Sequence, residues 1–464
     1  MSRAARVATV VGLVGGALPL SSPASATACT VPSMTYPTIQ SAIADVSCDP
    51  IMVAAGTYNE DLDIDRNITM TGAGANVTTV DGSGTGSVID IVNDTPDTVT
   101  ITGVTVTGGG MDAGAGIDID GVTVDTAHVV TLGQVLVTGN TATGNGGGIS
   151  VGNTVTLTMS NSAVTNNASG NFGGGIGASQ PTLLKLVNVT ISGNTAAGGT
   201  GGVGAVGPMD LSNVTIVNNT ADSNSDGLGD GGGLRVQTPT GSATIRNTLI
   251  ANNVDASPGA EDPDCEGPIT TAGYNVIEAV SAGCGFVAGT GDLTGMDPLV
   301  GALGSNGGPT PTHPLLSGSL AIDAGNPAGC SDGVNPLATD QRGEPRAVDG
   351  NEDGMVRCDI GAFELQPPKD PKDLALKAKP KRVEQGKRTR LIATITPCNA
   401  DTQGDLVQFR KGSKVLAEKA SDSSCMARKR VKVRRKTSFR AFSPEDDDSL
   451  AATSKKVTVK VLQA

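Results

Sequence analysis

Aromatic residues are almost absent from this sequence of 464 residues, which contains no Trp, three Tyr and six Phe. Between residues 59 and 273 the only aromatic side chain is Phe172. Grooves that hold sugars normally present aromatic rings to the ligand. The composition therefore argues against an enzyme that holds a polysaccharide along an aromatic cleft.

Histidine and charge are also scarce. The two histidines, His128 and His313, are too few for His-rich metal sites and argue against a catalytic triad. We expect His313 to be a packed or turn histidine. Beyond the N-terminus no apolar run approaches the roughly 20 residues that span a bilayer, so we expect no transmembrane segment after signal removal. We expect no nucleic-acid partner, and the oligomeric state stays open.

The N-terminus has the pattern of a secretory signal peptide. Arg3 and Arg6 precede an apolar run over residues 7–20, and a run of small residues follows at 24–28. We predict a signal peptide over residues 1–28, cleaved near Ala26 or Ala28. The mature protein would then be secreted or held at the cell surface.

Eight cysteines fall into four local pairs. Exported chains with an even number of cysteines usually join them in disulfides. Lipidation of Cys29 is the alternative for the first pair, but it would leave Cys48 without a partner. We therefore predict four disulfides: Cys29 with Cys48, Cys265 with Cys284, Cys330 with Cys358, and Cys398 with Cys425.

The centre of the chain is a repeat in which an Asn or Gln is followed six positions later by Asn. The first of the two columns advances by 27, 27, 25 and 34 residues, so one rigid turn recurs while a loop changes length. The five pairs are Gln134/Asn140, Asn161/Asn167, Asn188/Asn194, Asn213/Asn219 and Asn247/Asn253.

Apolar residues keep the same places around each repeat. One alternating pair precedes the first Asn column, as at Leu157 and Met159, a second follows it, and a third position follows the glycines, as at Ile176. Three short strands per turn that all face one axis must stack in parallel on the next turn. This pattern predicts an all-β parallel β-helix of triangular section. An earlier coil keeps the register at 99–117, with Gly103 and Gly109 in the Asn columns.

Charge divides the chain into two domains. Residues 368–464 carry 24 Lys and Arg against 11 Asp and Glu, whereas the rest of the chain is acidic. Alternating segments in the basic part predict a small immunoglobulin-like β-sandwich. Its lysines could bind anionic cell-surface polymers or could simply protect exposed strands. We assign residues 29–82 to an N-terminal cap and first coils, 83–260 to central coils, 261–366 to C-terminal coils and cap, 367–371 to a linker and 372–464 to the basic domain.

The cap includes a predicted short helix. Thr38 can cap its start, and Ile39, Ala42, Ile43 and Val46 form one apolar stripe. A β-helix needs such a plug because its open end exposes unpaired strands and core.

Several motifs resemble known families. The segments 36–40 and 56–58 resemble the opening of many right-handed parallel β-helix proteins, and the glycine-rich elements resemble the repeats of polymorphic outer-membrane-type adhesins. The motifs at 313–325, 340–343 and 358–364 resemble the ending of the choice-of-anchor Q family of exported bacterial β-helix proteins. The resemblance implies a right-handed, pectin-lyase-like helix, a surface or secreted location and no settled activity.

Enzymes of this fold provide the alternative interpretation, a lyase or hydrolase that acts on acidic polysaccharide. The pairs Asp63/Asp65 and Asp118/Asp120 have strand spacing and would each share one face. Lys185 and Arg246 are predicted on outward positions of one coil face, where they could contact a uronate. Solvated surface charge is the simpler explanation of these residues, so we favour a structural, adhesive or glycan-binding module over an enzyme.

Two loops have the spacing of hard-cation sites. A six-residue insertion supplies Asp222, Asn224, Asp226 and Asp230 in the order D-x-N-x-D-G-x-x-D, and residues 349–354 repeat the theme with Asp349, Asn351 and Asp353. Alternate oxygens and a glycine turn can wrap Ca²⁺, although such strings also form ordinary surface turns. We predict a Ca²⁺ site in each loop.

Overall fold

The computed structural model describes residues 27–92, 98–119, 128–179, 182–227, 229–258, 261–367, 373–396, 398, 405–444 and 451–462. The predicted signal peptide, up to residue 26, lies outside these residues. The chain divides into two compact units, Met1–Gln366 and Pro367–Ala464, which are described separately.

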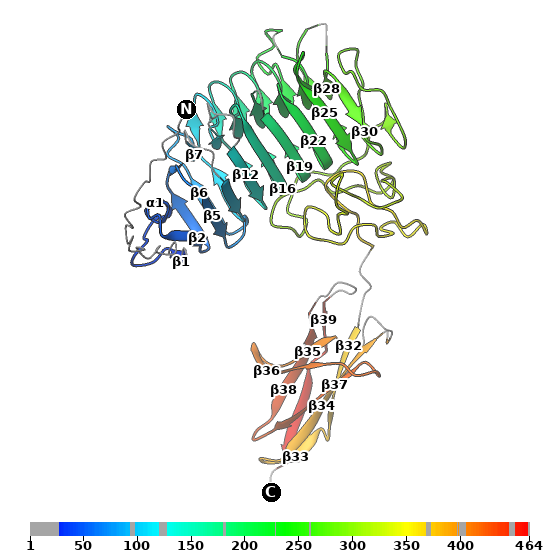
Figure 1. Ribbon diagram of the computed structural model, residues 1–464. Helices are drawn as coiled ribbons and strands as arrows, with labels where there is room; N and C mark the ends of the chain where they lie inside the picture. Colours follow the sequence, from blue (N-terminus) through cyan, green and yellow to red (C-terminus); the bar gives the residue numbers. More distant parts are fainter. Residues whose placement is uncertain are drawn as a thin grey trace, which may run out of the picture. The chain divides into compact units, whose positions relative to one another are not determined.

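The first unit is a parallel β-helix in which equivalent strands stack from coil to coil (Figure 1). A first sheet occupies two sides of each coil, and its strands are β1 Thr27–Val31, β2 Cys48–Val53, β3 Gly56–Asn59, β5 Ile68–Gly72, β6 Thr78–Asp81, β8 Thr98–Thr102, β9 Thr105–Thr107, β12 His128–Gly133, β13 Leu136–Thr138, β16 Val155–Thr165, β19 Thr182–Ser192, β22 Pro208–Val217, β25 Ser242–Arg246, β26 Leu249–Ala251, β29 Ile269–Thr271, β30 Val276–Ile277 and β31 Leu293–Thr294.

Two smaller sheets complete the coils. The second sheet contains β4 Leu62–Ile64, β7 Ile89–Ile91, β11 Ile117–Ile119, β15 Ile149–Val151, β18 Ile176–Ala178, β21 Val203–Ala205, β24 Leu234–Val236 and β28 Cys265–Glu266. The third sheet contains β10 Gly110–Met111, β14 Thr141–Ala142, β17 Ala168–Ser169, β20 Thr195–Ala196, β23 Thr220–Ala221 and β27 Val254–Asp255.

The predicted register is confirmed. Leu157 pairs with Leu184, and Leu184 pairs with Met209 in the next coil. These side chains and Ile176 are at most 3% exposed and belong to one continuous core. The alternation of apolar and polar residues therefore fixes which face of each strand points inward, because a slip of one residue would reverse every side chain.

The first Asn column makes the bend between two strands. Each of its five residues has a positive φ, from 44° at Asn247 to 54° at Asn213, and Gly103 takes the same place in the earlier coil with a φ of 66°. Asn and Gly enter this left-handed region at lower cost than other residues. The residues of this column are therefore explained by the left-handed backbone conformation that the bend requires.

The second Asn column is a buried hydrogen-bond ladder. The backbone N–H and the carboxamide of Asn167 both donate to the Asn194 carboxamide oxygen, each at 3.0 Å, and Asn194 repeats this arrangement toward Asn219. The ladder continues through Asn253 to the carboxylate of Asp264. Each step satisfies polar groups that would otherwise be buried without partners.

The N-terminal cap contains the predicted helix in a shorter form. Helix α1 spans Ile39–Ile43, with a capping box at Thr38, and Ile39, Ala42 and Ile43 are buried. The prediction for Val46 was wrong, because the helix ends before it and its side chain is 81% exposed.

Residues 297–366, here the flanking segment, fold back along the outer face of the first sheet (Figure 1). Thr190 donates to Gln341, and the Ala362 N–H donates to Thr215. His313 is packed as expected, because it is 3% exposed and its ring nitrogens lie 2.8 Å from the Ser192 hydroxyl and 2.7 Å from the Gly301 carbonyl oxygen. The segment therefore covers part of the wall of the β-helix.

All four predicted disulfides are present. Cys330–Cys358 lies within the flanking segment, and Cys398–Cys425 lies in the second unit. Each cross-link joins cysteines 19 to 28 residues apart and therefore closes a short loop.

The second unit is a β-sandwich. One sheet has the order β32-β34-β37, and the other joins β33, β40, β38, β35 and β36, with β39 paired to β38. The strands are β32 Asp373–Lys379, β33 Arg382–Glu384, β34 Arg388–Thr396, β35 Leu406–Lys411, β36 Lys414–Ala420, β37 Met426–Lys432, β38 Thr437–Ser443, β39 Ala452–Thr453 and β40 Val457–Leu462.

The two Asn columns predict opposite mutational effects. Asn194→Ala should lower the free energy of unfolding by about 3 kcal/mol, because it leaves two Asn167 donors and the Val164 carbonyl oxygen without their partner. Gln134→Gly should stabilise the protein or leave it unchanged, because glycine relieves the left-handed strain of about 1–2 kcal/mol at this exposed residue. Urea unfolding of both variants measures the difference, and equal effects would contradict the assignment.

Candidate functional site

The outer face of the second sheet carries one residue from each coil in a straight column. Each strand has three residues or fewer, and the residues that flank its outward position point into the core. Register places these outward residues in line: Asp63, Asp90, Asp118, Ser150, Gly177, Gly204, Arg235 and Glu266.

The two glycines of this column leave room for an aromatic ring. A Cβ on Gly204 would lie 2.3 Å from Cζ of Phe172, so the ring rests directly on this strand. Around it is a groove of about 280 Å³, here the Phe172 groove. Its lining residues are Asn145, Ser150, Asn171, Phe172, Gly177, Ala178, Ser179, Gly199, Val206, Arg235 and Gln237.

The chemistry of the Phe172 groove suits a polyhydroxylated ligand. Asn145, Asn171 and Gln237 supply amide donors and acceptors, and the ring of Phe172 supplies an apolar face. The Asn171 carboxamide donates to the Asn145 carboxamide oxygen at 2.9 Å, which orients both groups. The groove combines hydrogen-bonding amides, one ring and one guanidinium.

The guanidinium of Arg235 is held by two carboxylates. It lies 2.9 Å from Asp230 and 2.5 Å from Glu266. Burial and the nearby charge of Asp230 together raise the pKa of Glu266 to about 7, despite the opposing charge of Arg235. Arg235 and Glu266 were not predicted as site residues, although their alignment with Gly204 in the repeat could have placed them on the same face.

The expected catalytic residues do not come together. Asp118 lies on the second sheet, whereas Lys185 and Arg246 lie on β19 and β25 of the first sheet. Asp120 lies outside the described residues. Asp63 and Asp65 are exposed, at the N-terminal end of the column.

Lys185 and Arg246 are engaged in ion pairs. The Lys185 ammonium lies 3.0 Å from the Asp332 carboxylate in the flanking segment, and Arg246 pairs with Asp210. Gly333 lies against the guanidinium of Arg246, since a Cβ there would approach it to 2.8 Å. These two cations bind the flanking segment to the coils, and their side chains remain partly exposed. Their contact with a uronate stays a prediction.

The two Asp-rich loops have the same local hydrogen bonds. In the first, Asp222 accepts the N–H groups of Asp226 and Gly227, and in the second Asp349 accepts those of Asp353 and Gly354. Asn224 and Asn351 each donate to the second Asp of their loop. Each sequence motif thus folds into one compact turn.

The surroundings of the two loops differ. Asp230 of the first loop pairs with Arg235, and within the described chain the carboxylates of this loop do not form a group of three with ligand atoms within 4.8 Å. The Ca²⁺ site at Asp222, Asn224, Asp226 and Asp230 stays a prediction. The second loop does join such a group, with a residue that the sequence analysis did not assign to a site.

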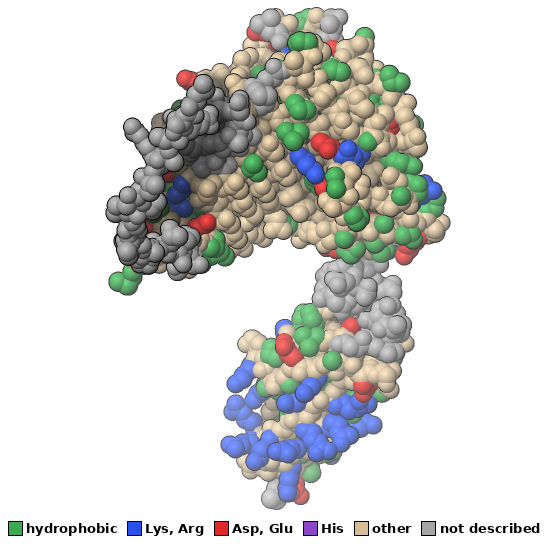
Figure 2. All heavy atoms as spheres, viewed as in Figure 1, with side chains coloured by type: hydrophobic (Ala, Val, Ile, Leu, Met, Phe, Trp, Pro, Cys, Tyr) green, Lys and Arg blue, Asp and Glu red, His purple; other side chains and the backbone are tan. Residues whose placement is uncertain are grey.

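The second unit has a basic surface (Figure 2). One groove of about 720 Å³, here the basic groove, has an apolar floor of Leu416, Val431 and Phe439. Within the described part of this unit no carboxylate lines it, and five cations do: Lys411, Lys429, Lys432, Arg434 and Arg435. Clustered cations beside apolar side chains can attract an anionic chain.

Comparisons agree with the architecture of the first unit. The family described as "Right handed beta helix region" matches residues 120–294, and no curated protein matches the chain. The chain is a right-handed parallel β-helix protein with a C-terminal β-sandwich. Over the described residues, no helix has the length and apolarity to cross a membrane.

Glu266 gives the β-helix a testable pH dependence. Its folded-state pKa of about 7 exceeds the ordinary value of 4.5. The contribution of this group to the stability of the fold is therefore fully present below pH 4.5 and is lost as the pH rises toward 7. Glu266→Gln should therefore gain stability relative to wild type up to about pH 7 and keep that gain above it. Thermal unfolding of the wild type and Glu266→Gln from pH 4 to pH 8 measures this difference, with the exposed Glu261→Gln as control. If the melting temperatures of the wild type and Glu266→Gln changed in parallel with pH, the predicted role of Glu266 would be wrong.

Proposed function

We propose that this protein is an exported β-helix protein that binds glycans, as an adhesive or structural module outside the cytoplasm. The Phe172 groove carries the proposal, because the one aromatic residue of the central coils lines it beside three amide side chains. Rings cover the apolar faces of sugars and amides pair with their hydroxyl groups.

Export rests on two independent features. The N-terminal 28 residues have the charge, apolar run and small residues of a signal peptide. Four disulfides leave no free cysteine within the described residues, as suits an oxidising compartment.

An enzyme acting on acidic polysaccharide is the second candidate, and Glu266 is the residue that favours it. A carboxyl group with a pKa of about 7 has the acidity of a general acid near neutral pH. Its ion pair with Arg235 also has a simpler role, which is to hold the guanidinium at the edge of the groove. New reducing or unsaturated ends after incubation with acidic polymers would favour the enzyme.

Binding to the Phe172 groove can be tested with a panel of neutral and acidic oligosaccharides. Phe172→Ala should weaken any binding at least about tenfold, a loss of about 1.4 kcal/mol. Gly204→Val should do the same, because its Cβ would displace the ring while the β-branched residue suits the strand. Leu183→Ala, an exposed apolar truncation on the first sheet, is the control. Equal binding by all variants would exclude the Phe172 groove as the binding site for the oligosaccharide.

The basic groove favours an anionic polymer as a further partner, the role that its five cations fit. Lys429→Ser with Lys432→Ser should weaken binding to a polyanion such as heparin or polygalacturonate by roughly 30-fold, at about 1 kcal/mol per cation. Binding of the wild type should weaken as salt rises.

The matched control removes two exposed lysines of the same unit outside that groove, Lys419→Ser with Lys456→Ser. Equal losses for both double variants would show that net charge alone, without the groove, holds the polymer.

A further inference from the structure

The carboxylate of Asp323 is buried in the flanking segment, and within the described residues it has no side-chain partner. Asp323 is 2% exposed, and within the described residues neither of its carboxylate oxygens has a partner with hydrogen-bond geometry. Its backbone is fixed, because its N–H donates to the Asp359 carboxylate at 2.8 Å. A buried ionised group without compensation is strongly unfavourable, so a partner is to be expected.

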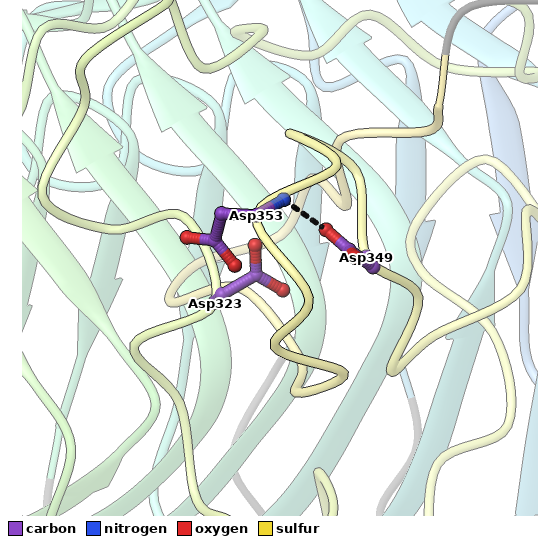
Figure 3. A group of neighbouring side chains, drawn as sticks. All are labelled: Asp323, Asp349 and Asp353. Atoms are coloured by element: carbon purple, nitrogen blue, oxygen red, sulfur yellow. Dashed lines mark hydrogen bonds between the residues drawn. The ribbon is translucent and has the colours of Figure 1, made fainter.

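Two further carboxylates face Asp323. Asp349 and Asp353, from the second Asp-rich loop, have oxygens that lie within 4.8 Å of one another and of an Asp323 oxygen. Figure 3 shows the three side chains converging from two segments, with the Asp353 N–H donating to Asp349 at 3.0 Å. An ion placed among oxygens at this separation could contact all of them at about 2.3–2.6 Å.

The positive charge near Asp323 only partly balances the negative charge of the three carboxylates. Burial raises the pKa of Asp323, the charges of Asp353 and Asp349 raise it further, and the backbone and charge of Arg357 offset only part of this. By contrast, the buried Glu364 of the same segment lies 3.1 Å from the guanidinium of Arg346.

We propose that Asp323, Asp349 and Asp353 bind a hard divalent cation, Ca²⁺, which ties residue 323 to the loop at 349–354. All three ligands are carboxylates, and Cys330 and Cys358 nearby in the chain are joined in a disulfide. An all-oxygen set excludes a thiolate or imidazole site for zinc. Water molecules would complete the coordination that Ca²⁺ prefers.

The first Asp-rich loop provides an internal control. Asp226 holds the same position as Asp353 and its loop makes the same hydrogen bonds, but no buried carboxylate comparable with Asp323 joins it in a group of three within the described chain. Asp226→Asn and Asp353→Asn therefore make the same chemical change in equivalent turns.

Calorimetric titration with CaCl₂ of the mature protein, stripped with chelator, tests the site. Wild type and Asp226→Asn should each take up Ca²⁺ at the proposed site. Asp353→Asn and Asp323→Asn should weaken that uptake by at least about 100-fold, since changes to outer partners of ligands alone cost about 10–100-fold.

Thermal unfolding separates binding from folding. Wild type should melt at a higher temperature with Ca²⁺ than with chelator. Without Ca²⁺, Asp323→Asn should melt no lower than wild type, because it removes a repelling charge, and it should lose the Ca²⁺-dependent shift. No uptake at millimolar Ca²⁺ would overturn the proposal, and so would uptake by Asp353→Asn and Asp323→Asn equal to that of the wild type. Asp226→Asn separates the two loops, because it removes any uptake by the first loop and should keep the proposed site. Glycan binding is measured in parallel, so that failure of the Ca²⁺ site can be distinguished from failure of the proposed function.

Discussion

The structure depends on keeping successive coils in register, and the buried Asn ladder is the interaction that holds this register. Each Asn fixes the next coil through two donors, and the ladder ends on Asp264. Because a carboxamide in this position satisfies both coils only when they are aligned, the ladder specifies the alignment as well as stabilising it. Outward residues of equivalent strands then become straight columns, which is how Gly204 and Arg235 come to share one surface.

The repeat could be predicted from sequence because its constraints are local and periodic. Positive φ at Asn213 and Asn247 and inward faces at Leu157 and Leu184 each recur at a fixed place in every coil. The flanking segment has no such period, so its contact between Thr190 and Gln341, across 151 residues, left no sequence signal. The second Asp-rich loop was visible in the sequence, whereas Asp323 was not, since it joins that loop only through the tertiary fold.

Charge is used differently in the two units. On the β-helix the cations Lys185, Arg235 and Arg246 each meet a carboxylate, so they fix segments and grooves and leave little free charge for a polyanion. Among the residues that the structure describes, no carboxylate lines the basic groove. This separation is consistent with a neutral or weakly charged glycan on the coils and an anionic polymer on the sandwich, because attraction of a polyanion needs uncompensated cations.

The flanking segment shows how a fold without regular strands can be fixed to a repetitive wall. Buried Arg346 reaches Glu364 within the segment and donates to Asn188 of the first Asn column, so one guanidinium links segment and coils. Its charge compensates Glu364, but Asp323 is buried in the same segment without an equivalent. The Asp349 turn brings two more carboxylates toward Asp323, so like charges repel one another in this part of the segment. A bound cation would supply there what Arg346 supplies at Glu364, and would complete the attachment of the segment along the coils.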